Sequence, residues 1–219
     1  MALLAKKKAK STVPPLAADT YAAVCVGVVD LGEQHSEKFK NYQSKVMFLF
    51  EIIGETVDVD GEAKPRWLSK EFTLSLSEKS NLAKSIEAWT GKEISDDDSD
   101  NGYDVTQLLG CPALVVVTLK ENDNGTFNDI SVITAPPKMM QIPDAESEKL
   151  CFVIEEWNDE VFKKLPEWIQ NKIKKSTEYQ TKYAPDKKVS FKGGENTDKT
   201  GENTGENDAK TVITDNIPF

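Results

Sequence analysis

Aromatic and basic side chains occur close together at several places in the first 130 residues of the sequence. The residues that suit one shared chemistry are Lys38, Phe39, Lys40, Tyr42, Lys45, Met47, Arg66, Trp67, Lys120 and Phe127. Aromatic rings stack on nucleobases, and lysine and arginine bind phosphate groups. If the fold brings these residues to one surface, that surface has the components of a site for a single nucleic-acid strand.

Residues for other chemistries are sparse. His35 is the only histidine, and the cysteines Cys25, Cys111 and Cys151 are far apart, so no zinc site is expected. The sequence contains no phosphate-binding glycine loop and no nucleophile elbow. We therefore predict a protein that is not an enzyme and needs no cofactor or metal. We expect its three thiols to be buried and unpaired.

The net charge of −10 comes from two segments. Residues 93–104 contain six acids and no base, and residues 193–219 contain six acids and two lysines, which together account for the whole charge. The first segment resembles a calcium-binding loop, but its glycine and glutamate spacing does not fit, so we expect a solvated, disordered loop. The remaining sequence is neutral overall and can carry a basic groove.

Alternating apolar residues and turn signals predict five strands, at residues 21–31, 45–53, 67–76, 113–120 and 126–134. Gly27 indicates a bulge in the first strand. Polar loops are expected at 32–44 and 56–65, and Asn124-Gly125 predicts a hairpin turn. Between the third and fourth strands, Ser77 is the expected N-cap of a helix that ends at Gly91.

This order predicts a mainly β fold: a five-stranded OB-type barrel with a helix between strands 3 and 4, extra C-terminal helices and a disordered acidic tail. OB folds bind oligonucleotides on the face of strands 2 and 3 and with the loops between strands 1–2 and 4–5. The aromatic and basic residues named first fall in those places. Fold analogy therefore supports their assignment as DNA-binding residues.

Composition divides the chain into four parts. We predict a flexible basic N-terminal arm at 1–18, a single-stranded DNA-binding core at 19–138, a helical extension packed on the core at 139–190, and a disordered acidic tail at 191–219. The extension is interrupted by Pro166 at a first-turn position. A homodimer contact or a second partner site on its apolar stripe remains an open alternative.

The C-terminal residues Asp215, Ile217, Pro218 and Phe219 resemble the tail tip of bacterial and phage single-stranded DNA-binding proteins, although Asn216 replaces an expected acid. The phenylalanine ring and terminal carboxylate suit a basic-rimmed apolar pocket. The stretches 45–51, 72–76 and 104–110 are similar to phage-encoded members of this family. The basic arm, the acidic loop and the added helices depart from the ordinary bacterial form, which is a homotetramer.

The resemblance implies sequence-independent binding and protection of single-stranded DNA during phage DNA replication or recombination, with replication and recombination proteins recruited through the tail. The alternative is an OB-fold adaptor that binds protein and competes for tail-docking partners. The sequence shows no secretion signal and no apolar run long enough for a membrane helix. We therefore expect the protein in the cytoplasm of a bacterial host cell, without membrane partners.

Overall fold

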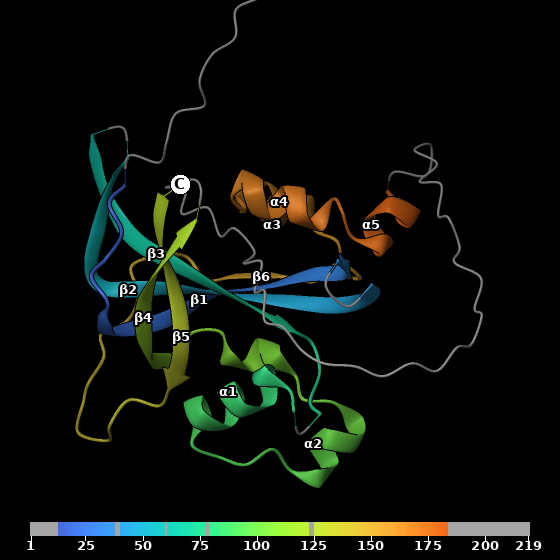
Figure 1. Ribbon diagram of the computed structural model, residues 1–219, viewed down its shortest axis with the longest axis horizontal. Helices are drawn as coiled ribbons and strands as arrows, with labels where there is room; N and C mark the ends of the chain where they lie inside the picture. The colour runs from blue at the N-terminus through green and yellow to red at the C-terminus, as the bar shows by residue number, and fades with distance from the viewer. Residues whose placement is uncertain (1–12, 38–39, 60, 78, 123–124, 184–219) are drawn as a thin grey trace, which may run out of the picture.

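The computed structural model describes residues 13–37, 40–59, 61–77, 79–122 and 125–183 (Figure 1). The strands are β1 (Asp19–Ser36), β2 (Asn41–Val59), β3 (Glu62–Thr73), β4 (Pro112–Asn122), β5 (Gly125–Thr134) and β6 (Leu150–Phe152). The helices are α1 (Asn81–Thr90), α2 (Asp96–Asn101), the 3-10 turn Val105–Leu108, α3 (Asp159–Lys164), α4 (Glu167–Ile173) and α5 (Thr177–Lys182). Among the described residues, no helix is long and apolar enough to cross a membrane.

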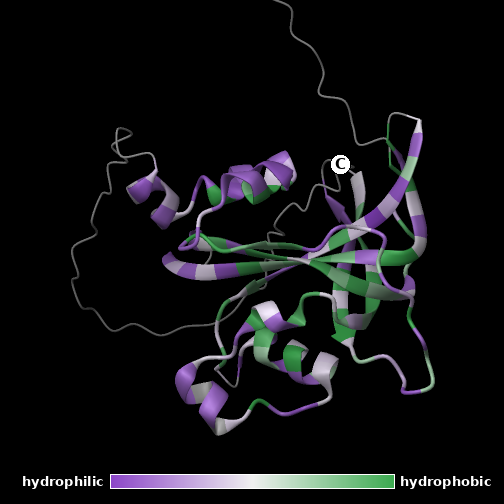
Figure 2. Ribbon diagram, turned by 180° about the vertical axis from the view of Figure 1, so that it is seen from behind, coloured by the Kyte–Doolittle hydropathy of each residue, from purple (hydrophilic) through white to green (hydrophobic). Residues whose placement is uncertain are grey.

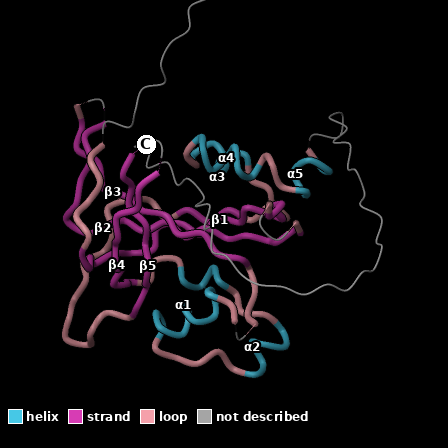
Figure 3. Tube along the Cα trace, viewed as in Figure 1, coloured by secondary structure: helices cyan, strands magenta, loops and turns pink. Residues whose placement is uncertain are grey.

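Five strands form a curled, antiparallel half-barrel sheet in the order β3-β2-β1-β4-β5, and the short β6 pairs in parallel with β1 (Figure 3). The predicted bulge at Gly27 is confirmed, because the β1–β2 register shifts between Cys25 and Gly27. A Cβ atom at Gly27 would lie 2.7 Å from the Leu49 side chain, so only glycine fits there. A second shift lies between Asp30 and Gly32.

The sheet is covered on both faces by helices (Figures 1 and 3). On the inner face, Phe48, Phe50 and Phe72 pack against α1, whose Leu82, Ile86 and Trp89 are buried. The helix begins at Ser80, whose hydroxyl accepts the Leu82 N–H, and it ends at Gly91 in the left-handed conformation. The predicted end at Gly91 is confirmed, but the predicted N-cap at Ser77 is wrong by three residues.

The outer face of β1 and β2 is covered by the C-terminal extension, which we define as residues 139–183. Met47, Leu49 and Leu31 pack there against Phe152, Phe162, Leu165, Ile169 and Ile173. Figure 2 shows hydrophobic residues along the sheet and hydrophilic residues on much of α3–α5. Pro166 separates α3 from α4, as its sequence position predicts. Both faces of the central strands are therefore buried.

Three carboxylates attach the extension to the sheet by accepting backbone N–H groups. Glu51 of β2 accepts the N–H groups of Glu146 and Ser147, at 2.8 and 2.9 Å. Asp30 of β1 accepts the backbone N–H of Ile154 at 3.2 Å. Conversely, Glu178 in the extension accepts the backbone N–H of Glu33 in β1. Burial raises the pKa of the Asp30 carboxyl. Charge-assisted hydrogen bonds of this kind fix the extension in one position.

Most strands are longer than predicted, but β3 ends at Thr73, three residues before the predicted end at residue 76. The expected loop 32–44 is mostly the antiparallel end of β1 and β2, where Gln34 pairs with Gln43, and the expected turn 56–65 continues β2 and β3 as far as Val59 and Glu62. Polar residues form strands here because backbone pairing extends beyond the apolar core. The acidic segment contains helix α2, capped by Ser95, so it is not wholly a disordered loop.

Two further expectations need correction. Of the three cysteines, Cys25 is buried, Cys111 is half-buried and Cys151 is exposed. Burial raises the pKa of the Cys25 thiol to about 12, which makes it unreactive. Residues 13–18, assigned to the flexible arm, lie against the sheet, since Leu16 is buried and its backbone N–H and C=O both bind the Asn128 side chain.

Candidate nucleic-acid interface

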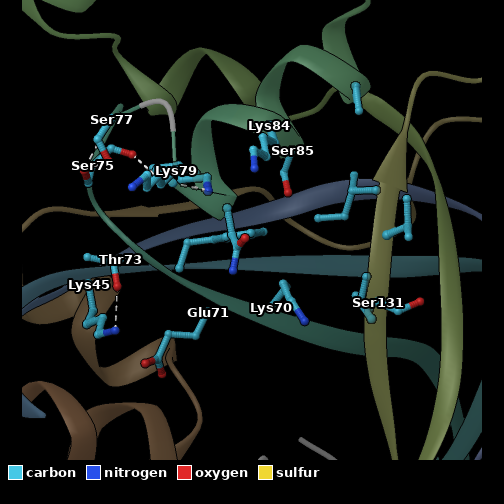
Figure 4. A pocket seen from close by; sticks show the side chains of 18 of the residues that line it. Lys45, Lys70, Glu71, Thr73, Ser75, Ser77, Lys79, Lys84, Ser85 and Ser131 are labelled. Carbon is cyan, nitrogen blue, oxygen red and sulfur yellow. Dashed lines mark hydrogen bonds between the residues drawn. The ribbon is translucent and has the colours of Figure 1, made fainter. Parts of the chain in front are cut away.

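A polar groove of about 780 Å³ runs between β3, the N-terminal end of α1 and β5 (Figure 4). It lies beside the free edges of β3 and β5, each of which pairs with only one neighbouring strand among those described. The buried side chains of Phe72, Leu82 and Ile130 contribute to its floor. The groove is therefore a surface feature at the opening of the half-barrel.

The ionised groups in the groove are mostly cations. Among the described lining residues are four lysines, Lys45, Lys70, Lys79 and Lys84, and one acid, Glu71. Glu71 forms an ion pair with Lys172 of α4, so its charge is already compensated. The groove is therefore electropositive in a chain whose net charge is −10.

The start of α1 positions two of these lysines. The apolar side of the helix, with Leu82 and Ile86, faces the core, which leaves Lys84 exposed on the groove side. Lys79 is also exposed and precedes the Ser80 cap. Neither lysine forms an ion pair with another described residue. Both ammonium groups can therefore bind an anion without first losing a partner.

The other two lysines are held by neighbouring side chains. Lys45 Nζ lies 2.8 Å from Thr73 Oγ1, and burial lowers the pKa of Lys45. Lys70 Nζ lies 3.3 Å from Asp129 Oδ1, which joins β3 to β5. Asp129 also binds Lys120, at 2.7 Å. One carboxylate thus restrains two lysines at the seam between the two edge strands.

Hydroxyl and amide groups fill the space between the lysines. They belong to Gln43, Thr73, Ser75, Ser77, Ser80, Asn81, Ser85 and Ser131. Hydroxyls, amides and ammonium groups are the side chains that bind phosphate oxygens along a nucleic-acid backbone. The only aromatic residue among the described lining residues is Phe72, whose exposed fraction is 6%. The groove thus suits a phosphate backbone better than stacked bases.

The predicted site residues of the first loop lie at the end of the β1–β2 hairpin, insofar as they are described. Lys40 is exposed, and Tyr42, with an exposed fraction of 42%, packs its ring against His35 at 5.2 Å. Lys38 and Phe39 lie outside the described residues. Tyr42 immediately precedes Gln43, which lines the groove, but Tyr42 does not line it. Of the predicted site residues that the structure describes, only Lys45 lines the groove itself.

Met47 and Trp67 were expected on an open face, and this expectation is wrong. Met47 is fully buried beneath the C-terminal extension, and Trp67 is partly buried there, with its indole Nε1–H donated to Ser147 at 2.8 Å. The alternation along β2 and β3 was predicted correctly. However, the extension covers the face that alternation alone would leave exposed to solvent.

Arg66 was expected to bind phosphate, but its side chain is buried. Its guanidinium donates to the Pro14 carbonyl oxygen at 2.8 Å and to Asn128 Oδ1 at 3.2 Å. Burial lowers the pKa of Arg66. Arg66 therefore holds residues 13–16 against β5, because Pro14 of this segment and Asn128 of β5 each supply an acceptor that a buried guanidinium requires.

Lys120 and Phe127 are register partners across the β4–β5 hairpin. Lys120 is exposed but paired with Asp129, and Phe127 is half-buried. Neither lines the groove. The partner-docking residues Asp215, Ile217, Pro218 and Phe219 lie outside the described residues, as does the whole predicted tail.

Sequence reasoning missed Lys70, Lys79 and Lys84. A signal for Lys79 and Lys84 was present, because the segment 77–85 combines serine, lysine, asparagine and one glutamate with a narrow apolar stripe. That pattern marks a polar helix start beside a core. Lys70 faces the same side as Phe72 on β3, and only the open seam beside β5 gives it access to solvent.

The described residues contain no group of three or more His, Cys, Asp or Glu side chains placed to hold a metal ion. No protein-family model matches the chain, and no curated protein sequence matches it significantly.

Proposed function

We propose that this chain binds single-stranded DNA without sequence preference, and that it protects DNA strands during phage replication or recombination. The observation that carries the proposal is the groove with four lysines and one compensated acid between β3, α1 and β5. A basic channel that tracks the phosphate backbone is the feature such proteins share. Binding through phosphate groups carries little sequence information, which accounts for the lack of preference.

The sheet topology also supports the proposal. The order β3-β2-β1-β4-β5, with α1 between β3 and β4, is the connectivity expected of a five-stranded OB-type barrel that is open between β3 and β5. Side chains bridge that opening, since Lys70 and Arg66 of β3 reach Asp129 and Asn128 of β5. OB folds are common binders of oligonucleotides, so this connectivity supports the proposal by fold analogy.

The binding surface we propose differs from the usual strand 2–3 face of an OB fold. The C-terminal extension covers that face in this protein. A DNA strand would instead lie along the edge of β3 and the start of α1, with phosphates near Lys79, Lys84 and Lys45.

The test is a titration of the full chain with oligo-dT at several salt concentrations. The variant Lys79→Ala/Lys84→Ala removes two unpaired groove lysines, and Lys92→Ala/Lys138→Ala is its matched control, because both residues are exposed and lie outside the groove. We expect the groove variant to bind more weakly, and its log–log salt slope to fall by about 1 for each lysine that no longer binds a phosphate. Equal affinities and slopes for the two variants would contradict the proposal. Absence of oligo-dT binding by the wild type would favour the adaptor function.

We further propose that the sequence end at Ile217, Pro218 and Phe219 recruits partner enzymes. This proposal rests on the sequence of these residues, in which an aromatic ring and a proline follow an acidic segment. Deleting residues 217–219 keeps the acidic residues of 193–216, so this variant should bind oligo-dT normally and recover fewer replication proteins from host lysate. The same recovery with and without residues 217–219 would rule out the docking function.

A further inference from the structure

A patch of aromatic rings lies at the junction of α3 and α5, away from the groove. Trp157 is at its centre, with ring centroids 4.6 Å from Phe162, 5.6 Å from Tyr179 and 4.5 Å from Tyr183. Phe162 is buried in the outer core, whereas Trp157, Tyr179 and Tyr183 are each partly exposed. We call these three partly exposed rings the ring patch.

Two lysines lie over rings at this site. Lys182 Nζ lies 5.5 Å from the centroid of the Tyr183 ring, and Lys174 Nζ lies 5.6 Å from that of Phe162. Two acids here are engaged with N–H groups: Glu178 of α5 accepts the backbone N–H of Glu33, and Asp159 accepts the indole N–H of Trp157 at 2.9 Å. Lys174 and Lys182 form no ion pair with another described residue. Flat rings combined with unpaired lysines suit a ligand that has both π faces and negative charge.

The ring patch is connected to one end of the groove through the β1–β2 hairpin. Gln43 lines the groove and pairs in register with Gln34. The Gln34 side chain donates to the Lys172 carbonyl oxygen of α4 at 3.0 Å, and the adjacent Glu33 binds α5. Figure 1 shows α5 beside this end of the hairpin. The β1–β2 hairpin thus contacts the groove through Gln43 and the helices α4 and α5 through Gln34 and Glu33.

Resting on the proposed function, we propose that the ring patch is a base-stacking platform, on which a single DNA strand continues after leaving the groove. The groove supplies lysines and hydroxyls for phosphates but has no exposed aromatic ring among its described lining residues. The ring patch supplies the rings that the groove lacks. Stacking on such rings is tolerant of sequence because every base has a π face.

The experiment compares Tyr183→Ala with Tyr183→Phe, which keeps the ring. Two probes are oligo-dT strands of about 4 and about 16 nucleotides, which are the shortest and longest sites covered by one OB-type module. The third probe is an abasic strand as long as the longer oligo-dT. We expect Tyr183→Ala to weaken binding of the long strand by roughly fivefold or more, the lower end for loss of one stacked base. Tyr183→Phe should bind all probes as the wild type does, and Tyr183→Ala should bind the short and abasic strands normally.

Unchanged affinity of Tyr183→Ala for the long strand, while Lys79→Ala/Lys84→Ala is impaired, would overturn the stacking platform and leave the groove intact. If neither variant is impaired, both proposals are wrong. Equal weakening with the abasic strand would also overturn stacking, because that strand has no bases. Should Tyr183→Ala not fold, photo-crosslinking of wild-type protein to iodouracil-substituted oligonucleotide replaces it. Adducts at Trp157, Tyr179 or Tyr183 support the platform, and adducts confined to the groove overturn it.

Discussion

The two faces of the half-barrel sheet are built from the same strands but have different roles. The outer face is closed by the C-terminal extension through a continuous apolar layer, fixed by Glu51, Asp30 and Glu178. The inner face is closed by α1, but its rim beside β3 and β5 stays open and polar. This difference shows that a binding surface need not lie on a sheet face. Here, the free edges of two strands and a helix start form the candidate site.

The largest effect should come from weakening the outer face. Phe152 of β6 is buried and packs against Trp157 and Phe162. We expect Phe152→Ala to lower the free energy of unfolding by about 3–5 kcal/mol, because it leaves a cavity in a packed layer. Urea denaturation measures this change. A loss below about 1 kcal/mol would mean that the extension is only loosely attached.

A smaller effect should come from one of the carboxylates that attach the extension. Glu51 is buried and accepts two backbone N–H groups through its two oxygens. In Glu51→Gln one oxygen becomes an NH₂ group, which leaves an N–H without its acceptor, so we expect a loss of about 1–3 kcal/mol. The exposed neighbour Glu146→Gln is the control. Faster proteolysis within residues 139–149 in Glu51→Gln, but not in Glu146→Gln, would show that this part of the extension has detached from β2. Equal free energies of unfolding for the two variants would contradict the attaching role of Glu51.

The start of α1 tests the inner face. The Ser80 hydroxyl accepts the Leu82 N–H at 3.1 Å and caps the helix that carries Lys84. Ser80→Ala should cost about 1 kcal/mol of stability, the usual value for a lost N-cap. Ser77→Ala is the matched control, because Ser77 lines the same groove without capping the helix. Thermal denaturation separates the two, and an equal loss in both would argue against Ser80 as the cap.

The smallest effect concerns the seam between β3 and β5. Asp129 binds Lys70 and Lys120, so Asp129→Asn releases two lysines beside the groove. We expect DNA affinity to rise by an amount equivalent to about 1 kcal/mol or less, the usual strength of such ion pairs. The gain should shrink as salt increases, because salt screens the released charges. An affinity that falls would show instead that Asp129 is needed to hold the two strands together.

Local signals predicted several elements well. Period-two apolar patterns located the five long strands, Gly27 marked its bulge, and Gly91 marked the end of α1. The ends of β1 and β2 were missed, because the polar residues there gain their structure from pairing rather than from burial. The near-continuous apolar runs 24–29 and 46–50 were a signal for strands buried on both faces. Such runs indicate that a further segment of the chain packs on the outer face of β1 and β2.

The sequence by itself determined the local elements and the positions of the basic and acidic segments. These follow from side-chain type and spacing along one chain. Only the tertiary structure decided which faces remain open, because exposure depends on what distant segments cover. Residues 139–183 bury Met47 and restrict Trp67, residues 13–16 occupy Arg66, and the unpaired edges of β3 and β5 leave Lys70 accessible. Burial is a property of packing between distant residues, and alternation within a strand cannot show it.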